Sequence, residues 1–209
     1  MHTYNDQIHK AISFTTSLGA SVPTFSFHGA ELLTEDNSAK VLDIIRAHGI
    51  TSFAPSVGQC LKWSHALLPL VARAMNCDIL LTIGQLHLRE SVIYGPTEGD
   101  FSRWYANGFR KSDFQHTRGL NLHAWYTLPS GEILDLTIWS TMGTVWQRPE
   151  MVGSVVGGYP DLLAPLPTYI PIVVGCDYVE TLEERTGGEL LSRSLSMSEL
   201  SRLPMLYLR

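Results

Sequence analysis

Apolar side chains recur at three- and four-residue spacing in the first third of the chain, and this spacing is typical of amphipathic helices. The pattern predicts helices over residues 5–18, 35–47 and 60–76. Thr34 is suited to cap the second of them, and Gly49 is suited to the left-handed conformation that ends it. The third is apolar on most faces, as expected for a helix packed on both sides. Pro69 predicts a kink or a new first turn within it.

Short apolar runs rich in branched and aromatic residues predict strands between and after these helices. The runs cover residues 79–83, 90–94, 122–128, 133–139 and 169–174. Pro129-Ser130-Gly131-Glu132 joins the third run to the fourth, and this is the strongest hairpin pattern in the chain. Pro171 removes a backbone donor from the last run, which predicts an edge strand.

Three segments show neither period and are expected to be loops. Residues 20–34 are predicted to be a loop that contains one short strand, and residues 153–167 a loop rich in Gly and Pro. Residues 96–119 form a polar and aromatic excursion with the length of a lid. The chain after residue 196 ends in a short helical pattern.

The order of elements predicts an α+β protein with a single domain over residues 1–209. Its expected parts are N-terminal helices over 1–50, a core over about 55–140, and a C-terminal strand and helix extension over 150–209.

Composition narrows the class of protein. A hydrophobic content of 44% with 17% charged residues is typical of a folded, soluble chain. The net charge of −5 gives no basic surface for nucleic acid, and no apolar run is long enough to predict a membrane partner. Three cysteines without a Cys-x-x-Cys pair indicate neither a disulfide scaffold nor a metal site, and no cofactor motif is present. The N-terminus has no signal-peptide pattern, so we expect a cytoplasmic protein or one exported without a cleaved signal.

The candidate chemistry centres on Cys60, which follows Gly58-Gln59 at the predicted start of a helix. A helix N-terminus favours a thiolate, and its free N–H groups can hold an oxyanion. His123 is the candidate acid and base, and Asp135 is the candidate carboxylate that orients it. Gln59 and Trp125 are candidates for oxyanion or substrate binding.

Strand geometry places a condition on this triad. His123 and Asp135 are 12 positions apart, so they share a sheet face only if the hairpin loop has an odd number of residues. A four-residue loop puts them on opposite faces. A bulge at Gly131, or a loop one residue longer or shorter, corrects the parity. The helix that carries Cys60 is then expected to pack across the face that carries both residues.

Three short motifs occur in an order that resembles the transglutaminase family. Gly58-Gln59-Cys60 resembles the Gly-Gln-Cys at that family's nucleophile, and the other two motifs, His123-x-Trp125 and Leu134-Asp135-x-Thr137, resemble its later elements. The resemblance covers about residues 55–140. It implies the papain-like thiol-enzyme fold, in which a helix bearing Cys packs on an antiparallel sheet bearing His and Asp. The small size implies a compact bacterial-type member.

The resemblance implies a cysteine-dependent acyl-transfer enzyme that acts on amides, as a glutamine deamidase, transglutaminase, peptidase or amidase. Its substrate is expected to be a protein or peptide, with a glutamine side chain as one option. Leu61 stands where the family usually has Trp, and no upstream glutamine has papain-like spacing. These departures keep open a catalytically inactive binding domain with the same fold. An arylamine-type N-acetyltransferase is a further alternative.

Other reactive side chains receive structural interpretations. Cys77 and Cys176 are expected to be buried small hydrophobes. His65 lies on another face of the Cys60 helix and is a weak rival base. Asp113 and His116 are expected in a solvated loop. The two arginines of the same region, Arg103 and Arg110, are candidates to hold an acidic substrate.

Overall fold

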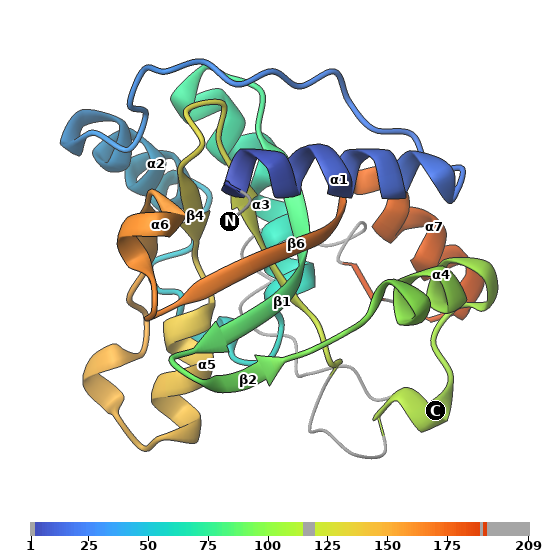
Figure 1. Ribbon diagram of the computed structural model, residues 1–209. Coiled ribbons are helices and arrows are strands. Elements are labelled where there is room, and N and C mark those ends of the chain that lie inside the picture. The colour runs from blue at the N-terminus through green and yellow to red at the C-terminus, as the bar shows by residue number, and fades with distance from the viewer. Residues whose placement is uncertain (1–2, 115–119, 189, 192–209) are drawn as a thin grey trace.

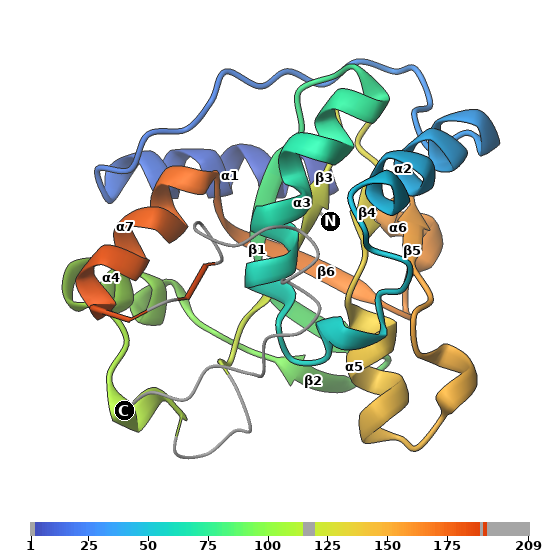
Figure 2. The same ribbon diagram turned by 180° about the vertical axis from the view of Figure 1, so that it is seen from behind.

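The computed structural model describes residues 3–114, 120–188 and 190–191. A six-stranded sheet, antiparallel at every pairing, lies between helices on its two faces. Figures 1 and 2 show α1 (Tyr4–Ser17) across one face and α3 (Cys60–Met75) across the other. The protein is therefore of the α+β class, as the sequence predicts.

The other helices are α2 (Glu35–Ala47), α4 (Glu98–Asn107), α5 (Ile138–Val145), α6 (Pro160–Leu163) and α7 (Cys176–Thr186), with 3-10 turns η1 (Ala54–Ser56), η2 (Lys111–Phe114) and η3 (Pro149–Met151). The strands are β1 (Leu80–Leu88), β2 (Ser91–Tyr94), β3 (His123–Thr127), β4 (Ile133–Asp135), β5 (Val156–Gly158) and β6 (Thr168–Val174). Their order is β2-β1-β3-β4-β5, and β6 pairs with β1. Within the described ranges β6 has this one partner, so the edge strand predicted from Pro171 is confirmed.

The three helices predicted from apolar spacing are present. Thr34 caps α2 by accepting from the backbone N–H of Asn37, and Gly49 follows it with φ 87°. The α3 helix runs from Cys60 to Met75 without a break at Pro69, whose ring is exposed to solvent. A proline there removes one helical hydrogen bond but does not divide the helix.

Two hydrophobic clusters fill the space on either side of the sheet. Strand residues alternate between them, as the two-residue period requires. Ala124 and Tyr126 of β3 belong to the cluster under α3, whereas Trp125 between them belongs to the cluster under α1. Hydrogen bonds also connect α3 to β3. The Tyr126 hydroxyl donates to the Ser64 carbonyl, and the Ser64 hydroxyl donates to the Ala124 carbonyl.

The hairpin between β3 and β4 has a three-residue loop. The Leu128 N–H donates to the Glu132 carbonyl, and the Gly131 N–H donates back to the Leu128 carbonyl. Gly131 adopts φ 86°, the left-handed position of a hairpin that carries a glycine bulge. The loop therefore has an odd number of residues, and a loop one residue shorter than four is one of the two ways to correct the parity.

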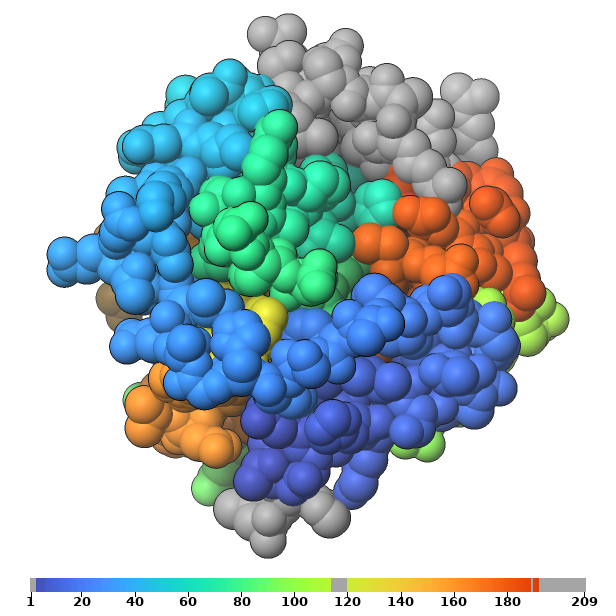
Figure 3. Space-filling model, turned by 90° about the horizontal axis from the view of Figure 1, so that it is seen from above, coloured from blue at the N-terminus to red at the C-terminus, as the bar shows by residue number. Residues whose placement is uncertain are grey.

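Glu132 connects this hairpin to the N-terminal part of the chain. Its carboxylate is buried and accepts from the backbone N–H groups of Leu32 and Leu33 and from the Ser130 hydroxyl. Figure 3 shows the blue N-terminal segments passing around the yellow atoms of the hairpin. The link between α1 and α2 is thus held at a defined point of the sheet.

Four expectations about particular segments are wrong. Residues 98–107 form α4, which packs on α7 through contacts that include the buried Phe101, so this part of the excursion is core and not a lid. The run 133–139 ends as a strand at Asp135, because α5 begins at Ile138. The 153–167 loop contains β5 and α6.

The fourth wrong expectation concerns the loop that joins α1 to α2. The expected short strand in 20–34 is absent from that described segment. The helical pattern after residue 196 lies outside the described residues. Among those that are described, no helix has both the length and the apolarity needed to cross a bilayer.

Candidate active site

Cys60 is the first residue of α3, where a helix presents N–H groups that have no intrahelical partner. Gln59 is the N-cap residue, and its backbone N–H donates to the Ser56 carbonyl. The thiol donates to the Leu122 carbonyl, with 3.7 Å between Sγ and O. Cys60 is buried, with 8% of the residue exposed, and its sulfur lies beside the carbonyl that precedes β3.

His123 and Asp135 meet on neighbouring strands. Nε2 of His123 lies 2.6 Å from Oδ2 of Asp135, and both residues are buried. The register pairs Tyr126 with Leu134, so Asp135 falls opposite Trp125 and diagonal to His123. Diagonal neighbours on one face are within reach of each other. The odd loop described above is what places the two side chains on the same face.

From residues that the structure describes, the Asp135 carboxylate accepts five hydrogen bonds. Oδ1 accepts from the backbone N–H and hydroxyl of Thr137 and from the backbone N–H of Ile138. Oδ2 accepts from His123 and from the hydroxyl of Tyr169. Such a set of donors can hold a buried carboxylate in its ionised form.

The two partners stabilise each other's charges. Burial disfavours the imidazolium of His123, but the charge of Asp135 and its hydrogen bond outweigh burial, and Cys60 adds to the effect; the pKa of His123 is raised to about 10. Burial also disfavours the ionised Asp135, yet the charge of His123 and the hydrogen bonds from His123, Thr137 and Tyr169 lower its pKa. At neutral pH the pair is therefore an imidazolium and a carboxylate.

The sulfur reaches this pair from the end of a strand. His123 and Trp125 lie on the α1 face of the sheet, whereas α3 packs on the opposite face. The expectation that the Cys60 helix crosses the face of His123 and Asp135 is therefore wrong. Cys60 instead approaches beside Leu122, where β3 begins, and it is close enough to raise the pKa of His123.

One nitrogen of the imidazole is available for the thiol. Nε2 is engaged by Asp135, while Nδ1 is buried and has no partner among the described residues. Besides Asp135, Cys60 raises the pKa of this ring. This geometry leaves Nδ1 to exchange a proton with sulfur or with a bound substrate.

Two aromatic rings stack on the imidazole, and a third, that of Tyr169, lies beside it with centroids 6.2 Å apart. Tyr94 of β2 stacks on His123 with ring centroids 5.4 Å apart and planes 13° apart. Trp125 stacks at 6.0 Å and 21°, is fully buried, and donates through Nε1 to the Tyr4 hydroxyl. Aromatic faces stabilise a cation. Trp125 is therefore a core residue that also forms one side of the candidate site.

Gln59 makes contacts along the helix start. Its Nε2 donates to the Pro55 carbonyl at 3.0 Å, and its Oε1 accepts from the buried Lys62 at 2.8 Å. These bonds direct the amide along the η1 turn. Among the described residues, no group of three or more His, Cys, Asp or Glu side chains is arranged to hold a metal ion.

Sequence reasoning missed three residues of the site: Tyr94, Thr137 as a donor, and Tyr169. Thr137 stands in the Asp-x-Thr motif, and its role could have been inferred from the tendency of a hydroxyl two residues after Asp to bond the carboxylate. Tyr94 and Tyr169 come from β2 and β6, so no local pattern connects them to His123.

The remaining candidates lie away from the pair. His65 contacts Glu180 of α7, with 3.0 Å between Nε2 and Oε1. Cys77 and Cys176 are half-buried free thiols, and burial raises the pKa of Cys176 to about 11. Asp113 is not a solvated loop residue, because Arg103 binds it through two nitrogens at 2.8 and 3.2 Å.

That ion pair occupies Arg103, so the arginine is engaged within the fold rather than left for an acidic substrate. The backbone N–H of Arg110 also donates to Asp113, at 2.7 Å. His116 lies outside the described residues.

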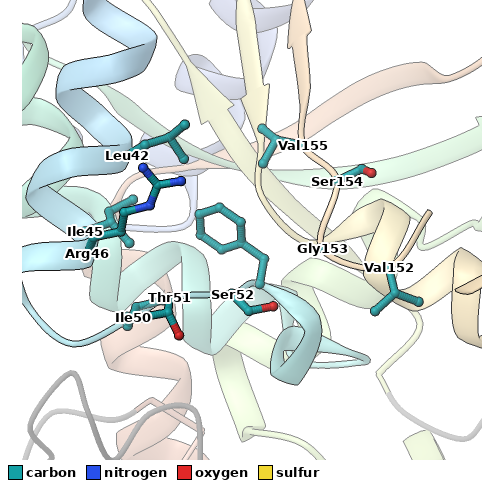
Figure 4. A pocket seen from close by; sticks show the side chains of 11 residues that line it. Leu42, Ile45, Arg46, Ile50, Thr51, Ser52, Val152, Gly153, Ser154 and Val155 are labelled. Carbon is teal, nitrogen blue, oxygen red and sulfur yellow. The ribbon is translucent and has the colours of Figure 1, made fainter. Parts of the chain in front are cut away.

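A separate cavity of about 460 Å³ lies between α2 and the 152–155 loop (Figure 4). Apolar side chains including Ile45, Ile50 and Phe53 line it together with Arg46. The cavity lining does not include the residues of the His123–Asp135 pair or Cys60.

Comparison with protein-family models, with curated proteins and with solved structures finds no match for this chain. The class that the structure defines is an α+β protein with helices packed on an antiparallel sheet. Any function must therefore be argued from the site.

Proposed function

We propose that the protein is a thiol acyl-transfer enzyme that acts on an amide, with Cys60 as nucleophile, His123 as acid and base, and Asp135 as the group that orients His123. The preferred substrate class is a protein or peptide amide, including the side-chain amide of glutamine. The motif order that resembles the transglutaminase family supports this class of reaction.

The reactive state is the ion pair in which the Cys60 proton has passed to Nδ1 of His123. From it, in the first step, the thiolate Sγ attacks the amide carbonyl carbon, and a C–S bond forms as the carbonyl π electrons move to oxygen. The carbonyl oxygen becomes an oxyanion, which the backbone N–H groups at the start of α3 can stabilise as hydrogen-bond donors. His123 then gives its proton to the departing nitrogen as the C–N bond breaks. A thioester remains on Cys60, and ammonia or an amine leaves.

In the second step water or another amine attacks the thioester. His123 accepts a proton from the attacking group, the C–S bond breaks, and the thiolate is restored. Asp135 stays ionised throughout and favours the protonated ring, which is the form needed for the first step. Water as the attacking group gives deamidation or proteolysis, and an amine gives transfer.

One observation carries the proposal. A buried imidazole bonds a fully buried carboxylate through Nε2, has no partner for Nδ1 within the described part of the chain, and lies beside a cysteine at a helix N-terminus. A core histidine with a structural role would be expected to pair both nitrogens when buried. The unpaired nitrogen near sulfur is the arrangement that a thiol enzyme needs.

The experiment compares wild-type protein with Cys60→Ala in ammonia release from a glutamine-containing peptide and in cleavage of a denatured protein. We expect wild-type turnover and its loss in Cys60→Ala, while the matched control Cys77→Ala keeps its activity. Full activity of Cys60→Ala in whichever assay responds would refute the role of Cys60. Ammonia release without cleavage would identify deamidation.

A second candidate is a non-catalytic domain that keeps the same arrangement, favoured by the 8% exposure of Cys60. The two candidates differ in the reactivity of the sulfur. Iodoacetamide should alkylate Cys60 faster than Cys176 in the folded enzyme if the sulfur is an accessible, activated nucleophile. Equal and slow labelling of both would favour the non-catalytic domain.

A further inference from the structure

Tyr169 adds a second donor to the carboxylate that orients His123. Its hydroxyl donates to Oδ2 of Asp135 at 2.9 Å, and this is the same oxygen that bonds Nε2 of His123 at 2.6 Å. The side chain is 2% exposed, and its ring also contacts Trp125 with centroids 5.0 Å apart. Its ring also lies beside that of His123, with centroids 6.2 Å apart, so a change to Phe keeps this ring contact and removes only the hydrogen bond to Asp135.

The hydroxyl is a permanent donor in this position. Burial and the charge of Asp135 raise the pKa of Tyr169 well above its ordinary value, so the phenol keeps its proton at neutral pH. A carboxylate oxygen has two lone-pair directions. At Oδ2 one is occupied by His123 and the other by Tyr169.

The backbone of β6 is brought to this place by a close approach to β1. A side chain at Gly84 would put its Cβ 2.1 Å from the Ile170 carbonyl oxygen, so the two strands can meet only where residue 84 has no side chain. The pairing shifts register between Ile83 and Gly84, and Leu86 then lies opposite Tyr169. The position of the phenol is therefore built into the sheet.

We propose that Tyr169 is a positioning residue of the active site, which holds the Asp135 carboxylate in place and weakens its attraction for the His123 proton. This inference rests on the proposed thiol acyl-transfer function. A phenol that shares Oδ2 withdraws electron density from it. The imidazolium thereby becomes a better proton donor to the departing nitrogen than it would be beside an unshared carboxylate.

Titratable groups surround His123 from several elements. Asp135 on β4 and Cys60 on α3 raise its pKa, the rings of Tyr94 on β2 and Tyr169 on β6 lie beside it, and Tyr4 on α1 acts on Tyr169. Tyr4 and Tyr94 also have raised pKa values through burial, so they stay neutral while His123 titrates. A change in the His123 titration on removal of one hydroxyl is therefore assignable to that hydroxyl.

The test is Tyr169→Phe in the full chain, with Tyr178→Phe as the matched control. Tyr178 is equally buried and also loses one hydrogen bond, from its hydroxyl to the Phe101 carbonyl, away from the site. The first readout is the His123 pKa, measured by NMR of ¹⁵N-labelled histidine. We expect it to rise by about one pH unit in Tyr169→Phe, from the loss of a hydrogen bond to a charged group, and to stay unchanged in Tyr178→Phe.

The second readout is kinetic, with the peptide benzyloxycarbonyl-Gln-Gly as probe. We expect kcat to fall about tenfold in Tyr169→Phe with KM unchanged, since the lost interaction acts on proton transfer and not on binding. An unchanged His123 pKa, or the same change in Tyr178→Phe, would overturn the proposal. If wild-type protein turns over no amide, the proposed function fails, while the His123 titration still decides whether Tyr169 acts through Asp135.

Discussion

The ion pair between His123 and Asp135 makes a prediction that does not depend on knowing a substrate. Asp135→Asn keeps the size of the side chain but removes its charge. The amide can still accept from Thr137 through its oxygen, but its NH₂ group then faces the two donors on His123 and Tyr169. The imidazole must become neutral for Nε2 to accept from this amide.

The magnitude follows from the titration of His123. A rise from 6.5 to about 10 favours the charged ring in the folded protein by about 5 kcal/mol. Removing one partner of a buried ion pair destabilises a protein by about 3–5 kcal/mol. We therefore expect Asp135→Asn to lose about 3–5 kcal/mol of unfolding free energy near pH 6. The His123 pKa should fall below 6.5, because burial, the largest influence on it, then acts without the opposing charge of Asp135.

The direction of each pKa shift determines how the stability of the protein changes with pH. The folded pKa of His123 is raised, so its contribution is fully present below pH 6.5 and is lost as the pH rises toward about 10. The folded pKa of Asp135 is lowered, so its contribution is present above the ordinary carboxyl pKa of 3.8 and is lost as the pH falls. Wild-type protein should thus lose stability between pH 6.5 and 10, and Asp135→Asn should lose much less.

The assay is equilibrium unfolding in urea across this pH range, combined with NMR titration of the histidines. Glu180→Gln is the control, because it removes the carboxylate that contacts His65 and leaves His123 untouched. A wild-type His123 that titrates near 6.5, or an Asp135→Asn variant whose stability follows the wild-type pH curve, would refute the reasoning.

Three further substitutions test how the site is supported. Gly131→Ala should cost about 1–2 kcal/mol, because a residue with Cβ is strained at φ 86°, whereas Gly29→Ala in open space should have little effect; equal melting temperatures would contradict this. Glu132→Gln should lower the unfolding free energy by about 1–3 kcal/mol and should speed proteolysis of the segment that begins before Leu32. An unchanged urea midpoint and cleavage rate would show that the bonds from Glu132 do not hold this segment. Thr97→Ala should lower the unfolding free energy by about 1 kcal/mol through loss of the α4 cap, and Thr97→Ser should restore it; indistinguishable Ala and Ser variants would exclude the cap.

Errors in the predicted elements have identifiable physical causes. Thr97-x-x-Asp100 forms a capping box at the start of α4, within a polar and aromatic stretch whose composition predicts a loop. The helix forms because Phe101 and Trp104 bury one side of it against the rest of the core. Contacts of this kind override local composition, and they come from parts of the chain that a local window does not include.

By itself the sequence determined the helices at the N-terminus, the hairpin, the edge strand and the order of Cys60, His123 and Asp135. These follow from local periods, capping residues and turn chemistry, which act over a few residues. Only the tertiary structure decided the rest. The three-residue loop that ends at Gly131 places His123 and Asp135 on the same face of the sheet. The packing of α3 places the sulfur of Cys60 at the start of β3. Tyr94 and Tyr169 come from strands that are distant in sequence. Those relations depend on register and on packing between separate elements, and a linear pattern carries no distance between them.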